Sequence, residues 1–381
     1  MEFEFTEDQK MLRSMIRDFA EEELAPAAKR VEETDEYPAD EIKKMAELGL
    51  FGLTIPEEYG GSGRGLLELC IVVEEMAKVS AAVDNYLRIS SSLAIVPILE
   101  YGTEAQRKKY LPPHVSGEKL ACFALTESEA GSDPAGISTT ARRKDGGYVI
   151  NGSKLFITNA EFAGTMVVFA TVDQSLRQKG ITAFVMDKAT DGLIIGRREE
   201  KMGMRGLVSN EVTFDNSFVS EGSRIGDEGQ GLRIALEALD VSRVTVGAEA
   251  VGISRAAYET ALDYAKERNQ FGEAIASFQS IQWMLADIAT QIDAARLMTY
   301  RAAYLHDTKQ PFVKEAAMAK VFASEVSNDV TDKALQIHGG YGYTKDYPLE
   351  RYLRDARVTE IYEGTSEMMR MTIARSIIRE G

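Results

Sequence analysis

A carboxylate near the C-terminus has surroundings suited to acid–base chemistry. Glu363 lies in the segment Ile361-Tyr362-Glu363-Gly364-Thr365, between apolar and small residues, unlike the acidic run Glu21–Glu23. An apolar environment raises the pKa of a carboxyl group, so that it can act as a base near neutral pH. An exposed carboxylate at the start of a helix is the structural alternative.

Two further segments combine glycines with hydrogen-bonding side chains. Leu125–Gly136 contains Thr126, Glu127, Ser132 and Asp133, and its hydroxyl and amide groups could donate to a polar ring or a phosphate. A β-turn with local caps is the alternative. The segment Gln336–Tyr343 contains Gly339 and Gly340, which either end a helix or allow a pyrophosphate close to the backbone.

Other chemistries find no support in the sequence. Gly61–Gly65 lacks the spacing and the strand–turn–helix context of a dinucleotide fingerprint, and GxxxxGK[ST] and GxSxG are absent. Three histidines without paired spacing predict no metal site. The net charge of −16 disfavours nucleic acid as a partner.

The composition also indicates where the chain works. No apolar run approaches the roughly 20 residues that span a bilayer. Two distant cysteines and an acidic segment at residues 1–5, unlike the basic start of a signal peptide, predict a cytoplasmic protein without membrane partners.

Three regions must position these residues. Helical periodicity predicts an N-terminal helical domain over 1–118, and dense glycines with short β-prone runs predict a middle β domain over 119–226. The short spacing favours an antiparallel barrel or sandwich. Long helical stripes predict a C-terminal helix bundle over 227–381. The predicted fold class is α+β, in the order helical, β, helical.

Taken together, these segments resemble the acyl-CoA dehydrogenase family. Its first signature is similar to Thr126-Glu127…Gly131-Ser132-Asp133, and its second is similar to Gln336…Gly339-Gly340…Arg351…Asp355. The segment around Glu363 resembles the part that carries the catalytic base in short- and medium-chain members. Phe156–Asn159 and Glu267–Gly272 also match, and the resemblance runs from end to end. It implies the family's fold, with a four-helix bundle at the C-terminus.

The resemblance implies an FAD-dependent reaction, with Glu363 as the base. The α-proton of an acyl-CoA is removed, and the β-hydride passes to flavin N5 to give a 2-enoyl-CoA. The thioester oxygen would accept a hydrogen bond from the Glu363 N–H. Some members carry the base at the position that matches Ser242, which cannot abstract a carbon-bound proton.

The resemblance also assigns the binding residues. Phe123, Thr126, Phe156 and Thr158 would surround the isoalloxazine, and Thr365 and Glu367 would contact the adenosine side. Ser132 would contact cofactor and CoA, and Asp240, Arg243 and Gly364 would bind substrate. The FAD of a neighbouring subunit would be met by Arg268, Phe271, Gln279, Gln336, Gly339 and Gly340. A homotetramer with an electron-transferring flavoprotein as acceptor is therefore expected.

The substrate is the least determined part of this prediction. Alignment with relatives places Asp84 near the acyl tail, where it would serve as a second base or substrate contact and would repel a distal carboxylate. A structural i,i+4 pair with Arg88 is the alternative. A compact, short-chain or alicyclic acyl-CoA is expected, with straight-chain butyryl or medium-chain substrates as the alternative. An acyl-CoA oxidase and an inactive flavin-binding module are the rival functions.

Overall fold

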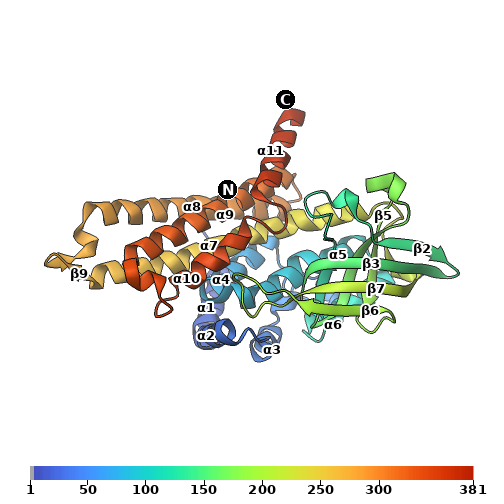
Figure 1. Ribbon diagram of the computed structural model, residues 1–381, viewed down its shortest axis with the longest axis horizontal. Coiled ribbons are helices and arrows are strands. Elements are labelled where there is room, and N and C mark those ends of the chain that lie inside the picture. Colours follow the sequence, from blue (N-terminus) through green and yellow to red (C-terminus); the bar gives the residue numbers. More distant parts are fainter. Residues whose placement is uncertain (1–3, 381) are drawn as a thin grey trace.

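The N-terminal part of the computed structural model is a layer of helices (Figure 1), and the structure describes residues 4–380. Capping boxes begin two of these helices, because Thr6 and Thr103 each accept from the backbone N–H three residues on. The helices are α1 (Glu7–Phe19), α2 (Ala25–Thr34), α3 (Ala39–Glu47), α4 (Leu66–Ile89), α5 (Val96–Tyr101) and α6 (Glu104–Val115).

Helix α4 is the central helix of this part. Ser80 interrupts this helix with a non-helical backbone (φ −152°, ψ 97°). Beyond the break every residue from Ser80 to Ile89 is buried, polar ones included. A π-helical turn, Ser90–Ala94, joins α4 to α5. Polar groups are thereby carried into the interior.

The middle part is a β-sheet of eight strands in the path β6-β7-β3-β2-β4-β5-β8, with β1 paired to β4. The pairings are antiparallel except for β1 with β4 and one residue pair between β2 and β4. Asp145-Gly146 forms the hairpin turn between β2 and β3. The strands are β1 (Leu120–Ala124), β2 (Thr140–Lys144), β3 (Gly147–Thr158), β4 (Ala163–Thr171), β5 (Ile181–Asp187), β6 (Leu193–Arg198), β7 (Ser209–Ser220) and β8 (Arg224–Ile225).

Long helices form the C-terminal part. They are α7 (Gly231–Glu267), α8 (Gln279–Asp307), α9 (Val313–His338), α10 (Leu349–Thr359) and α11 (Ser366–Glu380), and β9 (Asn269–Gln270) pairs with β10 (Glu273–Ala274). Figure 1 shows α7, α8 and α9 lying along the long axis, with β9 at the end opposite the β-sheet. Helix α11 projects away from the others.

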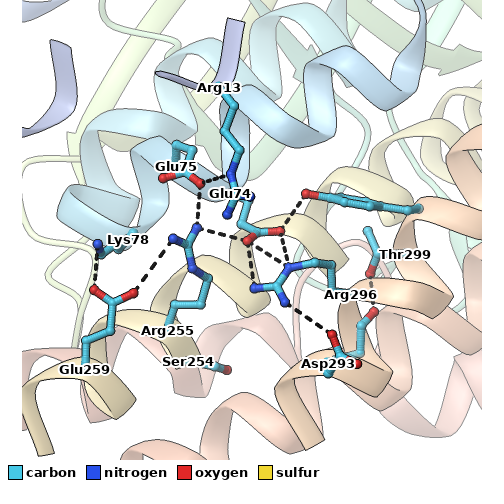
Figure 2. A network of polar contacts seen from close by, with 12 residues as sticks. Arg13, Glu74, Glu75, Lys78, Ser254, Arg255, Glu259, Asp293, Arg296 and Thr299 are labelled. Atoms are coloured by element: carbon cyan, nitrogen blue, oxygen red, sulfur yellow. Dashed lines mark hydrogen bonds and ion pairs between the residues drawn. The ribbon is translucent and has the colours of Figure 1, made fainter. Parts of the chain in front are cut away.

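Buried ion pairs join α4 to this bundle (Figure 2). Glu74 and Glu75 are each 1% exposed, and both accept from Arg255 of α7, at 2.9 and 2.8 Å. Arg296 of α8 and Arg13 of α1 complete the contacts. Removing one partner of such a pair costs about 3–5 kcal/mol, so the network fixes α4 against α7.

The helical, β, helical order confirms the predicted fold class. The boundaries at 118/119 and 226/227 remain a prediction, and residues 1–3 and 381 lie outside the described part. No helix among residues 4–380 is long and apolar enough to cross a membrane. In the same range, no cluster of three or more His, Cys, Asp or Glu residues could hold a metal ion.

Candidate active site

Glu363 lies in the loop between α10 and α11, with its side chain only 6% exposed. Its backbone is left-handed, with φ +55°. The Oε1 atom accepts from Arg88 Nη1 at 2.8 Å, whereas Oε2 is buried and has no hydrogen-bond partner. The exposed helix-start alternative is therefore wrong, and one carboxylate oxygen is left for another ligand.

Two cations hold the backbone of this loop. Arg243 Nε donates to the Glu363 carbonyl at 3.0 Å, and Lys320 Nζ donates to the Gly364 carbonyl at 2.7 Å. Burial lowers the pKa of Lys320 to about 8, although the Glu363 carboxylate opposes this. Position 364 favours glycine for two reasons. A Cβ there would lie 2.7 Å from Met369 Cε, and the backbone φ of +106° is one that residues with side chains rarely adopt. Backbone and side chain of Glu363 are thus both fixed.

Arg88 has no exposed surface and is the centre of a polar network between α4 and α7. Its Nη2 donates to Asn85 Oδ1 at 2.6 Å, and its Nε lies 3.1 Å from Glu249 Oε2. Asn85 and Tyr362 also donate to Glu249. Burial acts to lower the pKa of Arg88, but the carboxylates of Glu363 and Glu249 raise it above its ordinary value.

Asp84 does not form the pair with Arg88 that the sequence leaves open. Its side chain has no exposed surface, and neither carboxylate oxygen has a hydrogen-bond partner. Burial, with the neighbouring charge of Glu249, raises the pKa of Asp84 well above its ordinary value. Arg88 pairs with Glu249 and Glu363 instead, because those carboxylates lie against its guanidinium.

The predicted substrate residues Asp240 and Arg243 lie near Glu363, on α7. Arg243 Nη1 is 2.5 Å from Asp240 Oδ1, and both side chains are 9% exposed. Burial raises the pKa of Asp240 to about 6, against the opposing effect of Arg243. Arg243 thus connects a predicted CoA-facing pair to the backbone of the predicted base.

Strands β1 and β3 bring the predicted flavin residues to the same region. Leu155 N donates to Thr126 O at 2.9 Å, which joins the segment after β1 to β3. Phe123 packs against a buried cluster that joins the end of α4 to α7 and consists of Ile89, Leu93, Val96 and Ala238. Phe156 is 62% exposed, with a left-handed backbone (φ +58°), and Thr158 lies two residues further on. The junction of α4, α7 and β1 thus holds Phe123 near Arg88, the partner of Glu363.

A buried ion pair holds the loop that follows Thr126. Lys154 Nζ donates to Glu127 Oε1 at 2.7 Å, and the other Glu127 oxygen accepts from Ser138 N at 2.6 Å. Burial alone would raise the pKa of Glu127, but Lys154 lowers it to about 2. Ser132, on the same loop, is exposed.

Six of the remaining predicted cofactor residues lie on the bundle, away from this junction. A surface pocket of about 500 Å³ at the end of the bundle opposite the sheet is lined by Arg268, Gly339 and Gly340, among others. Phe271, in the turn between β9 and β10, is 96% exposed, and Gln279 and Gln336 are also exposed. Thr365 and Glu367 lie at the start of α11.

Several polar residues of the site were not predicted from the sequence, namely Asn85, Lys154, Glu249 and Lys320. The ion pair between Arg88 and Glu363 was not predicted either. A polar residue within a hydrophobic helical run was the available signal, as at Arg88 in Tyr86–Ile89. Their partners come from distant segments, so local patterns could not pair them.

Three family models match the chain. They are the N-terminal domain of acyl-CoA dehydrogenase at residues 6–118, the middle domain at 122–217 and the C-terminal domain at 229–378. An acyl-CoA dehydrogenase of Bacillus subtilis (strain 168) is 46% identical over 98% of both chains. A short-chain specific acyl-CoA dehydrogenase of Clostridium acetobutylicum is 44% identical over 100% of both chains.

Solved structures agree with these matches. Butyryl-CoA dehydrogenase from Megasphaera elsdenii has a TM-score of 0.98 at 42% identity, over 100% of both chains. A chain from a structure described as the electron transferring flavoprotein of Acidaminococcus fermentans has the same score at 44% identity and the same coverage. An acyl-CoA dehydrogenase complexed with FAD from Bacillus anthracis has a TM-score of 0.93 at 32% identity, over 99% of this chain and 68% of the other.

The residues present fit FAD. Phe156 offers an exposed ring next to the hydroxyl-bearing strand end, and no atom lies within 4 Å of a Cβ built at Gly131, Gly339 or Gly340, so a cofactor can approach the backbone there. The motifs, the fold and the full-length relatives agree. The chain therefore belongs to the acyl-CoA dehydrogenase family, as an FAD-dependent oxidoreductase that acts on CH–CH donors.

Proposed function

We propose that Glu363 is the base that removes the α-proton of a short, compact acyl-CoA. The observation that carries this proposal is the buried, unpartnered Oε2 of Glu363, close to the helix ends against which Phe123 packs. A carboxylate oxygen held out of water and without a donor is ready to receive a proton. FAD, when bound, supplies the acceptor for the β-hydride.

The loop around Glu363 would also stabilise the enolate. Because Arg243 and Lys320 hold the carbonyls of Glu363 and Gly364, the loop is fixed before substrate arrives. A fixed Glu363 N–H can then donate to the thioester oxygen, where charge develops. Asp240, Arg243 and Gly364, with the exposed Ser132, would bind the CoA thioester.

The substrate is proposed to be short, because side chains fill the junction beyond Glu363. Arg88 and Asn85 occupy it with no exposed surface. An alicyclic acyl group and a straight butyryl-like chain both remain candidates, and the relatives named for short-chain and butyryl substrates favour the straight chain. Asp84 is retained as a substrate contact or second base, since its oxygens are unpartnered.

We further propose a homotetramer in which each FAD also contacts a neighbouring subunit. The exposed Phe271 next to β9 and the pocket lined by Gln270, Gly339 and Gly340 support this arrangement, because β9 lies at the end of the bundle opposite the sheet that holds Phe156. An electron-transferring flavoprotein is the proposed electron acceptor, and the relative from a structure described by that name supports it.

The test is anaerobic flavin reduction by the purified holoenzyme. Butyryl-CoA, a branched acyl-CoA and cyclohexanecarboxyl-CoA are mixed with enzyme, and loss of the flavin absorbance and formation of 2-enoyl-CoA are followed. Bleaching by at least one of them is expected, with slow reoxidation by oxygen and fast reoxidation by an electron-transferring flavoprotein. Rapid peroxide formation would instead identify an oxidase, and no bleaching would refute the proposed function.

A further inference from the structure

Glu249 of α7 is a buried carboxylate whose two oxygens both face hydrogen-bond donors. Its side chain has no exposed surface. Oε1 accepts from Asn85 Nδ2, whereas Oε2 accepts from the Tyr362 hydroxyl and lies 3.1 Å from Arg88 Nε. Burial raises the pKa of Glu249, but the charge of Arg88 and the two hydrogen bonds oppose this. A protonated carboxyl needs an acceptor for its O–H, so a set of donors favours the ionised form.

Two of these donors lead directly to Glu363. Tyr362 precedes it in the chain, and Arg88 Nη1 donates to Glu363 Oε1 at 2.8 Å. The Tyr362 ring also lies against the guanidinium of Arg88, with 5.1 Å between the guanidinium carbon and the ring centroid. Glu249 therefore holds both the loop that carries the predicted base and the cation that binds its side chain.

The guanidinium of Arg88 lies between two carboxylates, and the proposed reaction changes only one of them. When the α C–H bond breaks, its proton goes to Glu363 and its electron pair stays on the substrate, so the Glu363 side chain becomes neutral. Glu249 then remains as the counter-ion of Arg88. Without the charge of Glu249, the same proton transfer would leave a buried cation uncompensated, which is costly.

We propose that Glu249 is a positioning residue for this reaction: it is the permanent counter-ion of Arg88, and it thereby keeps Glu363 able to accept the α-proton. Its hydrogen bond from Tyr362 also fixes the loop of the base. The proposal rests on the function proposed above and adds a residue that acts through others rather than on the substrate.

Other ionisable groups surround these two carboxylates. They are Asp84 and Arg88 of α4, Arg243 of α7, Lys320 of α9 and Tyr362 of the loop. Arg243 and Lys320 donate to backbone carbonyls of the loop, so these contacts do not depend on the charge of Glu249. Neither oxygen of Asp84 has a hydrogen-bond partner, so Asp84 offers Arg88 no second acceptor.

The experiment measures how anaerobic flavin reduction depends on pH in Glu249→Gln and in the wild-type holoenzyme, with the fastest acyl-CoA of the panel above. Glutamine keeps the size of the side chain and removes its charge. The second-order rate constant, like kcat/KM, reports the ionisation of the substrate-free enzyme. Because the charge of Arg88 then acts on Glu363 alone, the acid limb is expected to move to lower pH by about 1 unit or more. An acid limb that is unchanged or moves to higher pH overturns the proposal.

Two further variants assign the effect to the charge at this position. Glu249→Asp keeps the charge and shortens the side chain, so it should reduce flavin more slowly with the acid limb of the wild type. Glu259→Gln is the matched control further along α7, since Glu259 is 44% exposed and pairs with Lys78. It should change neither the rate nor the acid limb. A shift in either variant as large as that of Glu249→Gln overturns the role given to the Glu249 charge.

FAD content reports whether each variant folds. If Glu249→Gln lacks FAD or is not reduced at any pH, the profile of Glu249→Asp decides, because a shifted acid limb there overturns the proposal and an unshifted one supports it. If both variants lack FAD, Glu249 serves the folded state rather than the reaction, and the proposal is overturned.

The two proposals fail in different ways. If the wild type is bleached and the acid limb does not move in Glu249→Gln, the inference fails and the proposed function stands. If no acyl-CoA of the panel bleaches the wild type, the proposed function fails and the inference with it.

Discussion

Glu363 is held by three cationic side chains from three different helices. Arg88 of α4 binds its carboxylate, Arg243 of α7 binds its carbonyl, and Lys320 of α9 binds the next carbonyl along the chain. Glu363 has a left-handed backbone conformation, which is uncommon for a residue other than glycine. These three contacts offset the free-energy cost of that conformation. The position of the predicted base thus depends on the packing of the bundle.

Lys320→Met tests this dependence at a single residue. The change leaves the partly buried Gly364 carbonyl without its donor, which should lower the free energy of unfolding by about 1–3 kcal/mol. Flavin reduction should slow about 10-fold or more, because Glu363 is no longer fixed. Urea unfolding and stopped-flow absorbance measure the two effects.

Lys333→Met is the matched control on the same helix. Lys333 pairs with Asp329 at the surface, so its loss should change the unfolding free energy by no more than about 0.5 kcal/mol and leave the reduction rate unaltered. Equal effects of the two changes would contradict the role given to Lys320.

Among the elements, the loop after β1 depends on one buried ion pair. Glu127 accepts from Lys154 of β3 and from the backbone N–H groups of Ser138 and Thr139. The loop carries Thr126 and Ser132, two of the predicted ligand-binding residues. Its shape therefore depends on a charged group at its own start.

The pH dependence of stability follows from the direction of this shift. The pKa of Glu127 is about 2 in the folded protein and about 4.3 in an unfolded chain. The ionised Glu127 carboxylate therefore stabilises the folded protein fully above pH ~5, and this stabilisation is lost as the pH falls toward 2. Glu127→Gln should therefore destabilise the protein at pH 7 and reduce the further loss between pH 5 and pH 3. Thermal unfolding at the three pH values measures this.

Glu129→Gln is the control for this prediction, since Glu129 is exposed on the same loop. It should keep the acid sensitivity of the wild type. If Glu127→Gln lost as much thermal stability between pH 5 and pH 3 as Glu129→Gln does, Glu127 would not be the group that causes the acid sensitivity.

The elements also show what could be predicted from sequence. The capping boxes at Thr6 and Thr103 and the Asp145-Gly146 turn are determined by the preferences of adjacent residues, so the sequence itself indicates them. The parallel pairing of β1 with β4 was not, because it joins segments about 40 residues apart. Likewise, Glu363 was found from its neighbours in the sequence, whereas its partner Arg88 lies 275 positions away.

The whole molecule separates its predicted cofactor residues into two sets. Phe156 and Thr158 lie on the sheet, whereas Phe271 and Gly339 lie at the opposite end of the bundle (Figure 1). One FAD could contact both sets only if a second subunit supplied one of them. Cofactor retention should thus depend on the assembly.

Phe271→Ala tests this prediction. Because the side chain is 96% exposed, its removal should not change the stability of the isolated subunit, but FAD affinity should fall about 10-fold. Phe218→Ala, at another exposed phenylalanine, should leave FAD binding intact. Sedimentation and the flavin absorbance of gel-filtered protein measure assembly and retention, and a monomer that retains full FAD would contradict the shared site.

The most direct test of the central claim is the anaerobic absorbance spectrum of Glu363→Gln during mixing with the best acyl-CoA of the panel. The amide keeps the size of the side chain and cannot accept the α-proton. The variant should stay yellow with FAD bound, while the wild type is bleached within the same time. Bleaching of the variant at a rate near that of the wild type would show that another group removes the proton.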